Sequence, residues 1–253
     1  MDRSFLLQKE VIEASRDFVC IRLATYEDKE EVDYLTQVFH GPSGALENTV
    51  FTMLAPDARK YLARSGRAPQ WAFSDAADMA KSMRRFAAEY KPADTQKALP
   101  AMKDFRLSLD VAACDNMPLV AAVSDDHDER VKLNQKLAQV AWSRELLGRT
   151  AYARAAAAGD TAKTKLALQP GVYVIEPDAF GTGGKILAWM DSDADTAALT
   201  IGIAGALARF KPPVKEARTH ITDGVRKGIY WKTATPVTDP HGPRREEPAS
   251  GGQ

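Results

Sequence analysis

The sequence predicts an α/β protein made of two similar units in tandem. Short apolar runs rich in β-branched residues alternate with amphipathic helical segments, which is typical of α/β folds. Two predicted hairpins, at 49–64 and 172–189, each pass from an apolar strand through a Pro-Asp turn into a second strand and then a helix. The hairpins lie roughly 120 residues apart, which is the length of one small domain and the period expected of a domain duplication.

The first unit is expected over residues 1–92. After an N-terminal helix, the run Phe-Val-Cys-Ile-Arg-Leu-Ala at 18–24 is short, apolar and nearly continuous, as in a strand covered on both faces. A helix over 26–40, the hairpin at 49–64 and an amphipathic helix over 75–90 should complete the unit.

The second unit is expected over residues 93–212 and repeats this plan. Its expected elements are a helix over 104–116, a buried strand over 117–123, a long helix over 128–147, a short strand over 150–153, the hairpin at 172–189 and a closing helix that carries Leu199, Ile203 and Ala206 on one face. Residues 213–253 form a C-terminal extension, and its Pro, Gly, Ser and charged residues predict disorder from about residue 233.

The order strand, helix, hairpin, helix resembles the thioredoxin fold, and the second unit resembles it over nearly its full length. The resemblance makes 117–124 the central strand and 128–147 the active-site helix. It also places Gln169-Pro170 just before the hairpin, where thioredoxin-like proteins keep a cis-proline. The first unit resembles the part of a bacterial thioredoxin-like protein that follows the active-site cysteines, so it would lack the first strand and the dithiol.

Thioredoxin chemistry requires a Cys-x-x-Cys dithiol at the start of the active-site helix, where the helix dipole and nearby amides stabilise a thiolate. In the second unit, this position holds Ser-Asp-Asp-His-Asp-Glu at 124–129, with no sulfur. These acidic residues are good helix caps, and they disfavour a nearby thiolate. The second unit is therefore expected to be redox-inactive.

The remaining reactive residue types form no convincing catalytic or metal-binding pattern. Cys20 is expected to be a small buried hydrophobe within the strand at 18–24, and Cys114 lies beside Asp115, a poor setting for a reactive thiolate. The four histidines are scattered, and the neighbouring residues at 125–128 do not converge well on one metal ion. We therefore expect no catalytic residue, metal or cofactor.

Composition limits the possible partners. The chain has 34 basic and 34 acidic residues, so its formal net charge is zero, whereas nucleic-acid-binding proteins usually carry a basic excess. No apolar run reaches the length of a membrane span, and the N-terminus lacks the pattern of a signal peptide. A soluble, cytoplasmic protein is expected as the chain stands. A periplasmic or other extracytoplasmic location is expected instead if the true start lies upstream of Met1.

These observations predict a non-catalytic interaction module that binds a protein or an extended polypeptide. The predicted binding surface lies around Pro170, Gln169 and His127, where exposed backbone beside a cis-proline could pair with an added strand. Two alternatives remain open. One is a thiol-disulfide oxidoreductase whose dithiol lies upstream of Met1, and the other is a structural subunit of a larger assembly.

Overall fold

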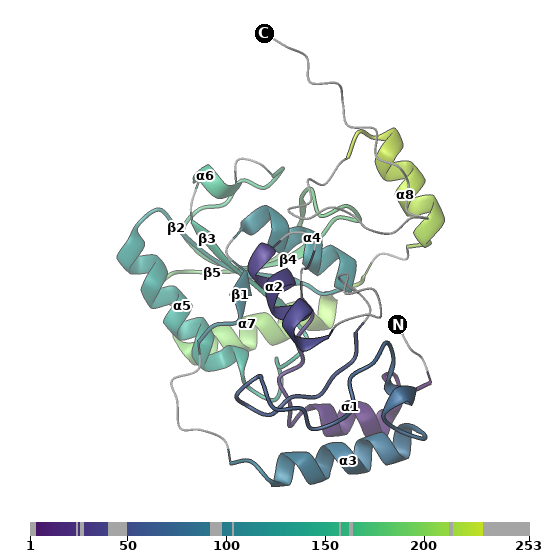
Figure 1. Cartoon of the computed structure of the whole chain (residues 1–253). Coiled ribbons are helices and arrows are strands. Elements are labelled where there is room, and N and C mark those ends of the chain that lie inside the picture. Colours follow the sequence, from purple (N-terminus) through teal and green to yellow (C-terminus); the bar gives the residue numbers. More distant parts are fainter. Residues whose placement is uncertain are drawn as a thin grey trace. The chain divides into compact units, whose positions relative to one another are not determined.

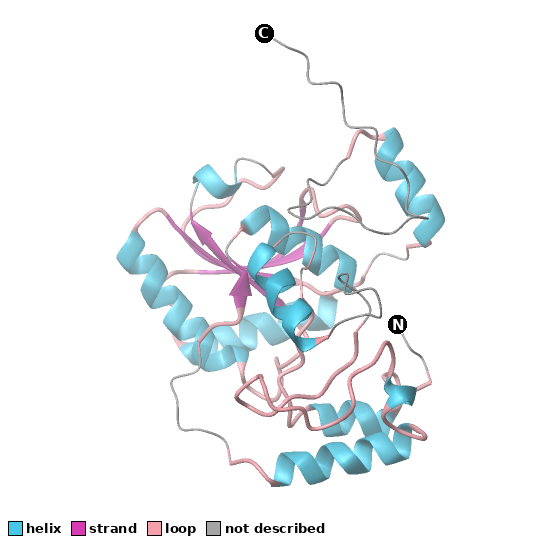
Figure 2. Cartoon of the chain, viewed as in Figure 1, coloured by secondary structure: helices cyan, strands magenta, loops and turns pink. Residues whose placement is uncertain are grey.

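The structure, a computed structural model, is α/β and divides into two compact units. Unit 1 comprises Met1–Tyr90 and Trp231–Gln253, and unit 2 comprises Lys91–Tyr230. The strands gather in unit 2 as a single mixed sheet flanked by helices (Figure 1, Figure 2). The residues that the structure describes are 4–23, 25, 28–39, 50–91, 98–102, 104–156, 158–161, 164–212 and 215–229.

The sheet of unit 2 has five strands in the order β1-β3-β2-β4-β5. These strands are β1 (Ala101–Met102), β2 (Leu119–Ser124), β3 (Ala151–Ala156), β4 (Gly171–Pro177) and β5 (Gly184–Met190). Strands β1, β3 and β2 are parallel, whereas β4 is antiparallel to β2 and β5 is antiparallel to β4. Val123 of β2 pairs with Gly171, so the carboxyl end of β2 and the amino end of β4 meet at one end of the sheet.

Helices cover both faces of this sheet (Figure 1). The helices of unit 2 are α4 (Phe105–Asp115), α5 (His127–Ala141), α6 (Ala158–Thr161), α7 (Thr196–Arg209) and α8 (Ala217–Arg226). Because side chains alternate along a strand, Val120 and Ala122 of β2 pack with α5 and α7, while Leu119, Ala121 and Val123 pack with α4. Every residue of β2 is buried, as expected of the central strand.

Aspartate side chains begin three of these helices. Asp104, Asp126 and Asp195 precede α4, α5 and α7, and each carboxylate accepts a hydrogen bond from the backbone N–H three residues further on, at 2.7–2.8 Å. Such caps satisfy a donor that the helix itself leaves free. The acidic segment at the start of α5 therefore has a structural role, as its sequence predicts.

In its described residues, unit 1 consists of helices connected by long irregular segments. The helices are α1 (Lys9–Ser15), α2 (Lys29–Val38), α3 (Ala76–Ala88) and a short 3-10 turn over Pro69–Trp71. The apolar face of α3 carries Met79, Met83 and Phe86. It packs in a separate core with Phe5 and Val11 of the N-terminal segment and with Met53 and Phe73 of the loops.

The strand expected over 18–24 is wrong for residues 18–23, which have no regular structure and leave Val19 and Ile21 largely exposed. The hairpin expected at 49–64 is reduced, in the described part of unit 1, to two isolated antiparallel bridges, Phe51 with Gly66 and Leu54 with Tyr61. A short apolar run forms a buried strand only where a sheet is available to pair with it. Among its described residues, unit 1 contains no sheet strand and therefore no visible second copy of the fold.

The elements expected in unit 2 are largely confirmed, with two differences. Helix α5 ends at Ala141, well before the expected residue 147, because the chain turns at Trp142, whose indole N–H donates to the carbonyl of Ala98 at 2.9 Å. Strand β1 and the short helix α6 are the second difference, since the sequence predicts neither. In the C-terminal extension, α8 is ordered, and the disorder expected from about residue 233 lies outside the described residues. No helix in the described ranges is long and apolar enough to cross a bilayer.

Candidate functional site

The fold brings the predicted binding residues to the same end of the sheet. Gln169 and Pro170 immediately precede β4, and His127 is the first residue of α5, which follows β2. The pairing of Val123 with Gly171 sets these two connections side by side. The His127 ring is exposed, and its Nδ1 lies 3.3 Å from the Arg130 guanidinium on the same helix.

The cis-proline expected at Pro170 is wrong. No cis peptide bond occurs in the described residues, so the Gln169–Pro170 bond is trans. The trans isomer is the lower in energy for most X–Pro bonds. The next residue, Gly171, begins β4 with a φ of 137°, a conformation open to glycine and rarely adopted by other residues.

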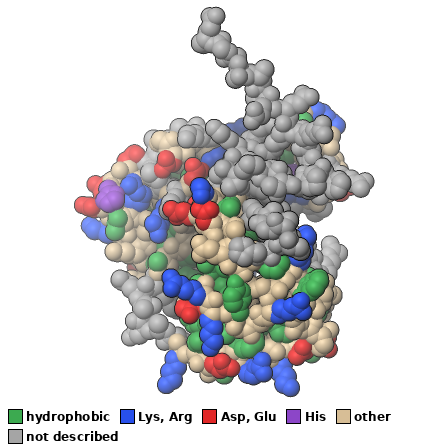
Figure 3. Space-filling view, in the orientation of Figure 1, with side chains coloured by type: hydrophobic (Ala, Val, Ile, Leu, Met, Phe, Trp, Pro, Cys, Tyr) green, Lys and Arg blue, Asp and Glu red, His purple; other side chains and the backbone are tan. Residues whose placement is uncertain are grey.

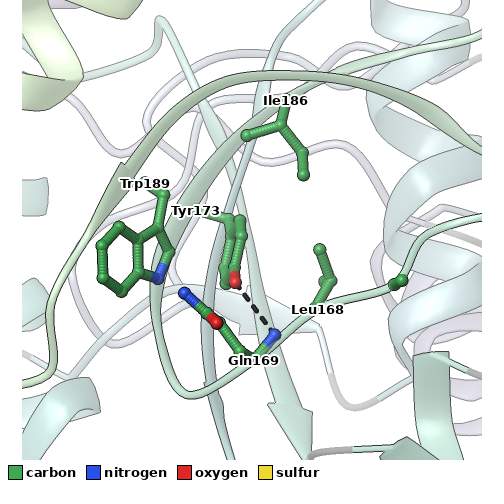
Figure 4. A pocket seen from close by; sticks show the side chains of 6 residues that line it. Leu168, Gln169, Tyr173, Ile186 and Trp189 are labelled. Carbon is green, nitrogen blue, oxygen red and sulfur yellow. Dashed lines mark hydrogen bonds between the residues drawn. The ribbon is translucent and has the colours of Figure 1, made fainter.

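A shallow hollow of about 500 Å³ is lined by Gln169, the residue before Pro170, and by Trp189, which is hydrogen-bonded to Pro170 (Figure 4). Tyr173 of β4 and Trp189 of β5 are direct cross-strand partners, and Ile186 follows on the same face of the sheet. Three residues of the loop before β4 close the opposite side. The complete lining is Ala167, Leu168, Gln169, Tyr173, Ile186 and Trp189. None of these side chains is charged.

Two hydrogen bonds hold the aromatic residues of the hollow in place. The backbone N–H of Gln169 donates to the Tyr173 hydroxyl at 2.9 Å, and the indole N–H of Trp189 donates to the carbonyl of Pro170 at 3.2 Å. Tyr173 is only 3% exposed, whereas Trp189 and Ile186 are each 42% exposed. The hollow thus has a buried floor and a rim that solvent reaches.

Gly171 allows the Trp189 indole to cross toward Pro170. A Cβ at position 171 would lie 2.4 Å from Nε1 of Trp189 and 2.5 Å from the carbonyl oxygen of Met190. Both distances are shorter than van der Waals contact. A side chain at this position would therefore change the shape of the hollow.

The free edge of β5 is partly covered. The β4–β5 ladder has a register shift between Val174 and Ile175, and Arg209 of α7 donates to the Leu187 carbonyl at 2.7 Å. Bulges and charged side chains are common devices that prevent another strand from pairing with a sheet edge. The face that carries the hollow is therefore more accessible to a ligand than the backbone of β5.

The start of α5, where the resemblance would place a dithiol, is occupied by a closed hydrogen-bond network. Ser124 is buried, and its hydroxyl donates to Glu129 at 2.5 Å and accepts from the N–H of Asp126 at 3.0 Å. Arg130 donates to the Ser124 carbonyl at 2.8 Å. The pKa of Glu129 is lowered mainly by the hydrogen bond from Ser124 and, to a smaller extent, by one from Ser192. The pKa of Asp126 is lowered mainly by the hydrogen bond that its carboxylate accepts from the backbone N–H of Glu129. Ser124 is thus engaged as a capping partner.

Both cysteines are exposed, so the prediction that Cys20 is a buried hydrophobe is wrong. Although residue 20 as a whole is exposed, desolvation of the sulfur raises the pKa of the Cys20 thiol, and a contact with Ser15 partly opposes this rise. Within the described ranges, no three His, Cys, Asp or Glu side chains gather closely enough to hold a metal ion.

On the face shown in Figure 3, basic and acidic side chains of the described residues are interspersed. Neither sign forms a continuous field there, in keeping with the balanced composition. The uncharged, largely apolar hollow is the feature of unit 2 that is best suited to binding.

No family model, curated protein or solved structure matches this chain. A function is therefore inferred from the geometry of the site. Of the residues that line the hollow, reasoning from sequence named only Gln169; Pro170 lies next to it in the chain, His127 is not part of the lining, and Tyr173, Ile186 and Trp189 were not named. A tryptophan in the last strand of a predicted sheet, opposite a tyrosine, was the available signal, since exposed aromatic residues are enriched in binding surfaces.

Proposed function

We propose that unit 2 is a thioredoxin-like module without redox chemistry, and that it binds extended polypeptide at the hollow beside Pro170. The observation that carries this proposal is the hollow itself, an apolar depression with a half-exposed tryptophan on its rim and a buried tyrosine at its floor. Tryptophan and tyrosine are the residues that most often dominate protein binding energy.

The topology supports the thioredoxin-like part of the proposal. Unit 2 has a buried central strand, β2, followed by a helix, α5, and later by the hairpin β4–β5 and the closing helix α7. This is the order on which the resemblance rests. Unit 1 offers no such order among its described residues, so the proposal is limited to unit 2.

The network at the start of α5 supports the absence of redox chemistry. Its sulfur-free segment is committed to capping, with Ser124, Asp126 and Glu129 each hydrogen-bonded. Thiolate chemistry requires a cysteine with a depressed pKa, whereas the pKa of Cys20 is raised.

The size and polarity of the hollow support a polypeptide ligand. Pockets that bind ligands typically have volumes of roughly 300–1,000 Å³ and a mainly apolar lining. The hollow has a mainly apolar lining of this kind but is shallow and wide open, which suits an extended chain laid across it with a side chain in the hollow. Because Arg209 and the bulge cover part of the β5 edge, we favour side-chain insertion over strand addition.

Binding of an array of extended dodecapeptides to the full chain tests the proposal. The best binder is then titrated by fluorescence anisotropy against Trp189→Ala and against Ile201→Ala. Ile201 is 74% exposed on α7, which covers the other face of the sheet, so it provides a matched control. We expect Trp189→Ala to weaken binding about tenfold or more and Ile201→Ala to leave it unchanged. Equal effects of the two substitutions, or the absence of any binding peptide, would overturn the proposal.

A further inference from the structure

We infer that the hollow recognises a large, neutral, apolar side chain together with a carbonyl oxygen next to it, and that the Tyr173 hydroxyl donates to this oxygen. The inference rests on the proposed function and specifies its ligand: a polypeptide segment that presents an aromatic or large aliphatic residue. It assigns Trp189 and Ile186 to the side chain and Tyr173 to the backbone.

The Tyr173 hydroxyl has a donor to spare. Its oxygen accepts the hydrogen bond from the Gln169 N–H, and a phenol also carries one hydrogen to donate. Among the described residues, this hydroxyl donates no hydrogen bond that accompanies the one it accepts. Tyr173 is almost fully buried, and its hydroxyl lies beside the loop that closes the hollow (Figure 4). This donor is therefore available to an acceptor that enters the hollow, and a ligand carbonyl oxygen is such an acceptor.

The rest of the lining defines the other half of the ligand. Leu168, Ile186 and Trp189 offer apolar surface, and no lining residue carries a charge. A charged ligand group would lose hydration there without gaining an opposite charge. The hollow is large enough for one large side chain with its flanking backbone.

The backbone of the adjacent loop is already committed to internal bonds. The N–H of Gln169 is bonded to Tyr173, the carbonyl of Pro170 accepts from Trp189, and Pro170 has no N–H. Residues 169 and 170 therefore offer little for pairing with an added strand. We therefore expect the side chains of the hollow to bind the ligand, with the buried Tyr173 hydroxyl as the hydrogen-bond donor.

Three small probes separate the two parts of the ligand. N-acetylphenylalaninamide has an aromatic side chain flanked by carbonyls, toluene has the ring alone, and N-acetylglycinamide has the carbonyls alone. Each is titrated into the full chain by heteronuclear NMR, with the Gln169 amide and the Trp189 indole as reporters. We expect N-acetylphenylalaninamide to bind with at least about fivefold higher affinity than either partial probe. Equal affinities of N-acetylphenylalaninamide and toluene would overturn the inference.

Tyr173→Phe then tests the donor. We expect it to weaken binding of N-acetylphenylalaninamide about fivefold while toluene binding stays the same, which also shows that the hollow is intact. Tyr152→Phe is the matched control, because Tyr152 is a buried tyrosine of the same sheet that packs in the core on the α5 and α7 side. An unchanged affinity for N-acetylphenylalaninamide in Tyr173→Phe would overturn the inference.

The inference and the proposed function fail in different ways. If array peptides bind in a Trp189-dependent manner but Tyr173→Phe has no effect, the inference is wrong and the proposed function stands. If N-acetylphenylalaninamide binds in a Tyr173-dependent manner but no peptide binds, the proposed function is wrong. The ligand of the hollow is then a small amide and not a polypeptide.

Discussion

The indole N–H of Trp189 donates to the carbonyl oxygen of Pro170 at 3.2 Å, across the position where residue 171 has no side chain. This bond joins the end of β5 to the loop that enters β4. It holds the exposed tryptophan at the rim of the hollow in a defined orientation. Preorganised aromatic residues lose less conformational entropy when a ligand binds.

Replacing Gly171 with alanine tests this arrangement. The new Cβ meets both Trp189 and the Met190 backbone, and the φ of 137° is unfavourable for alanine. We expect the free energy of unfolding to fall by about 1–3 kcal/mol, measured by urea denaturation. The NMR resonance of the Trp189 indole should also move, because its hydrogen bond to Pro170 is displaced.

Two other glycines separate backbone strain from collision. Gly148 has a φ of 71°, and a Cβ added there would meet no atom within 4 Å. Gly159 does not have a positive φ, and a Cβ added there would also meet no atom within 4 Å. Gly148→Ala should therefore cost less than Gly171→Ala, and Gly159→Ala should cost least. If Gly148→Ala and Gly171→Ala are equally destabilising, collision with Trp189 is not the reason.

The core between the sheet and α7 should be sensitive to truncation. Ile203 is fully buried against the strands, whereas Ile201 on the same helix is exposed. We expect Ile203→Ala to lower the free energy of unfolding by about 2–5 kcal/mol. Ile201→Ala should change it by no more than about 0.5 kcal/mol, as for an ordinary surface position. Similar losses for both, measured by urea denaturation, would contradict the position of α7 on the sheet.

The carboxylate of Glu129 should respond to Ser124. Its pKa is lower in the folded chain, mainly because the Ser124 hydroxyl donates to it. The stability that this bond contributes is therefore present above the unfolded-state pKa and is lost as the pH falls through the lower, folded-state value. Ser124→Ala should raise the Glu129 pKa in a carboxyl NMR titration.

Ser143→Ala is the control for this titration. Ser143 is also a serine of unit 2 with a buried hydroxyl, and this hydroxyl has no hydrogen-bond partner among the described residues. The substitution should leave the Glu129 pKa unchanged. An unaltered pKa in Ser124→Ala as well would show that another interaction holds the carboxylate.

Peptide binding should not depend on either thiol. We expect the variant with both Cys20→Ser and Cys114→Ser to bind the best array peptide within about twofold of the native affinity, since no sulfur lines the hollow. Loss of binding in a stably folded double variant would contradict a non-redox role.

With Cys114→Ser alone, alkylation of Cys20 should accelerate only at a higher pH than for a free thiol, because the pKa of the Cys20 thiol is raised.

The sequence predicts the elements of unit 2 well because several independent signals agree there. The run 117–123 is almost entirely apolar, and acidic caps precede α4, α5 and α7. The end of α5 is harder to predict because Leu146 continues the apolar pattern, although it is buried by a series of turns instead of a helix. A two-residue strand such as β1 is too short to produce a recognisable period.

The segment at 18–23 shows what such patterns leave out. Val19, Cys20 and Ile21 favour a strand, yet a strand also requires a neighbour, and the local sequence does not specify one. The hollow escapes prediction for a related reason. Trp189 and Ile186 look like ordinary core residues of a strand, and only the position of β5 at the edge of the sheet leaves them half exposed.

The bond from Arg209 to Leu187 has a consequence for how the protein behaves at high concentration. With no net charge, copies of the chain repel one another little, and a sheet edge beside an exposed tryptophan invites self-association. The Arg209 guanidinium already occupies the carbonyl oxygen of Leu187, a residue of β5 at the register shift. Leu187 therefore has one backbone acceptor fewer to offer to a strand of another copy, and occupied acceptors of this kind are one way in which sheet edges avoid pairing.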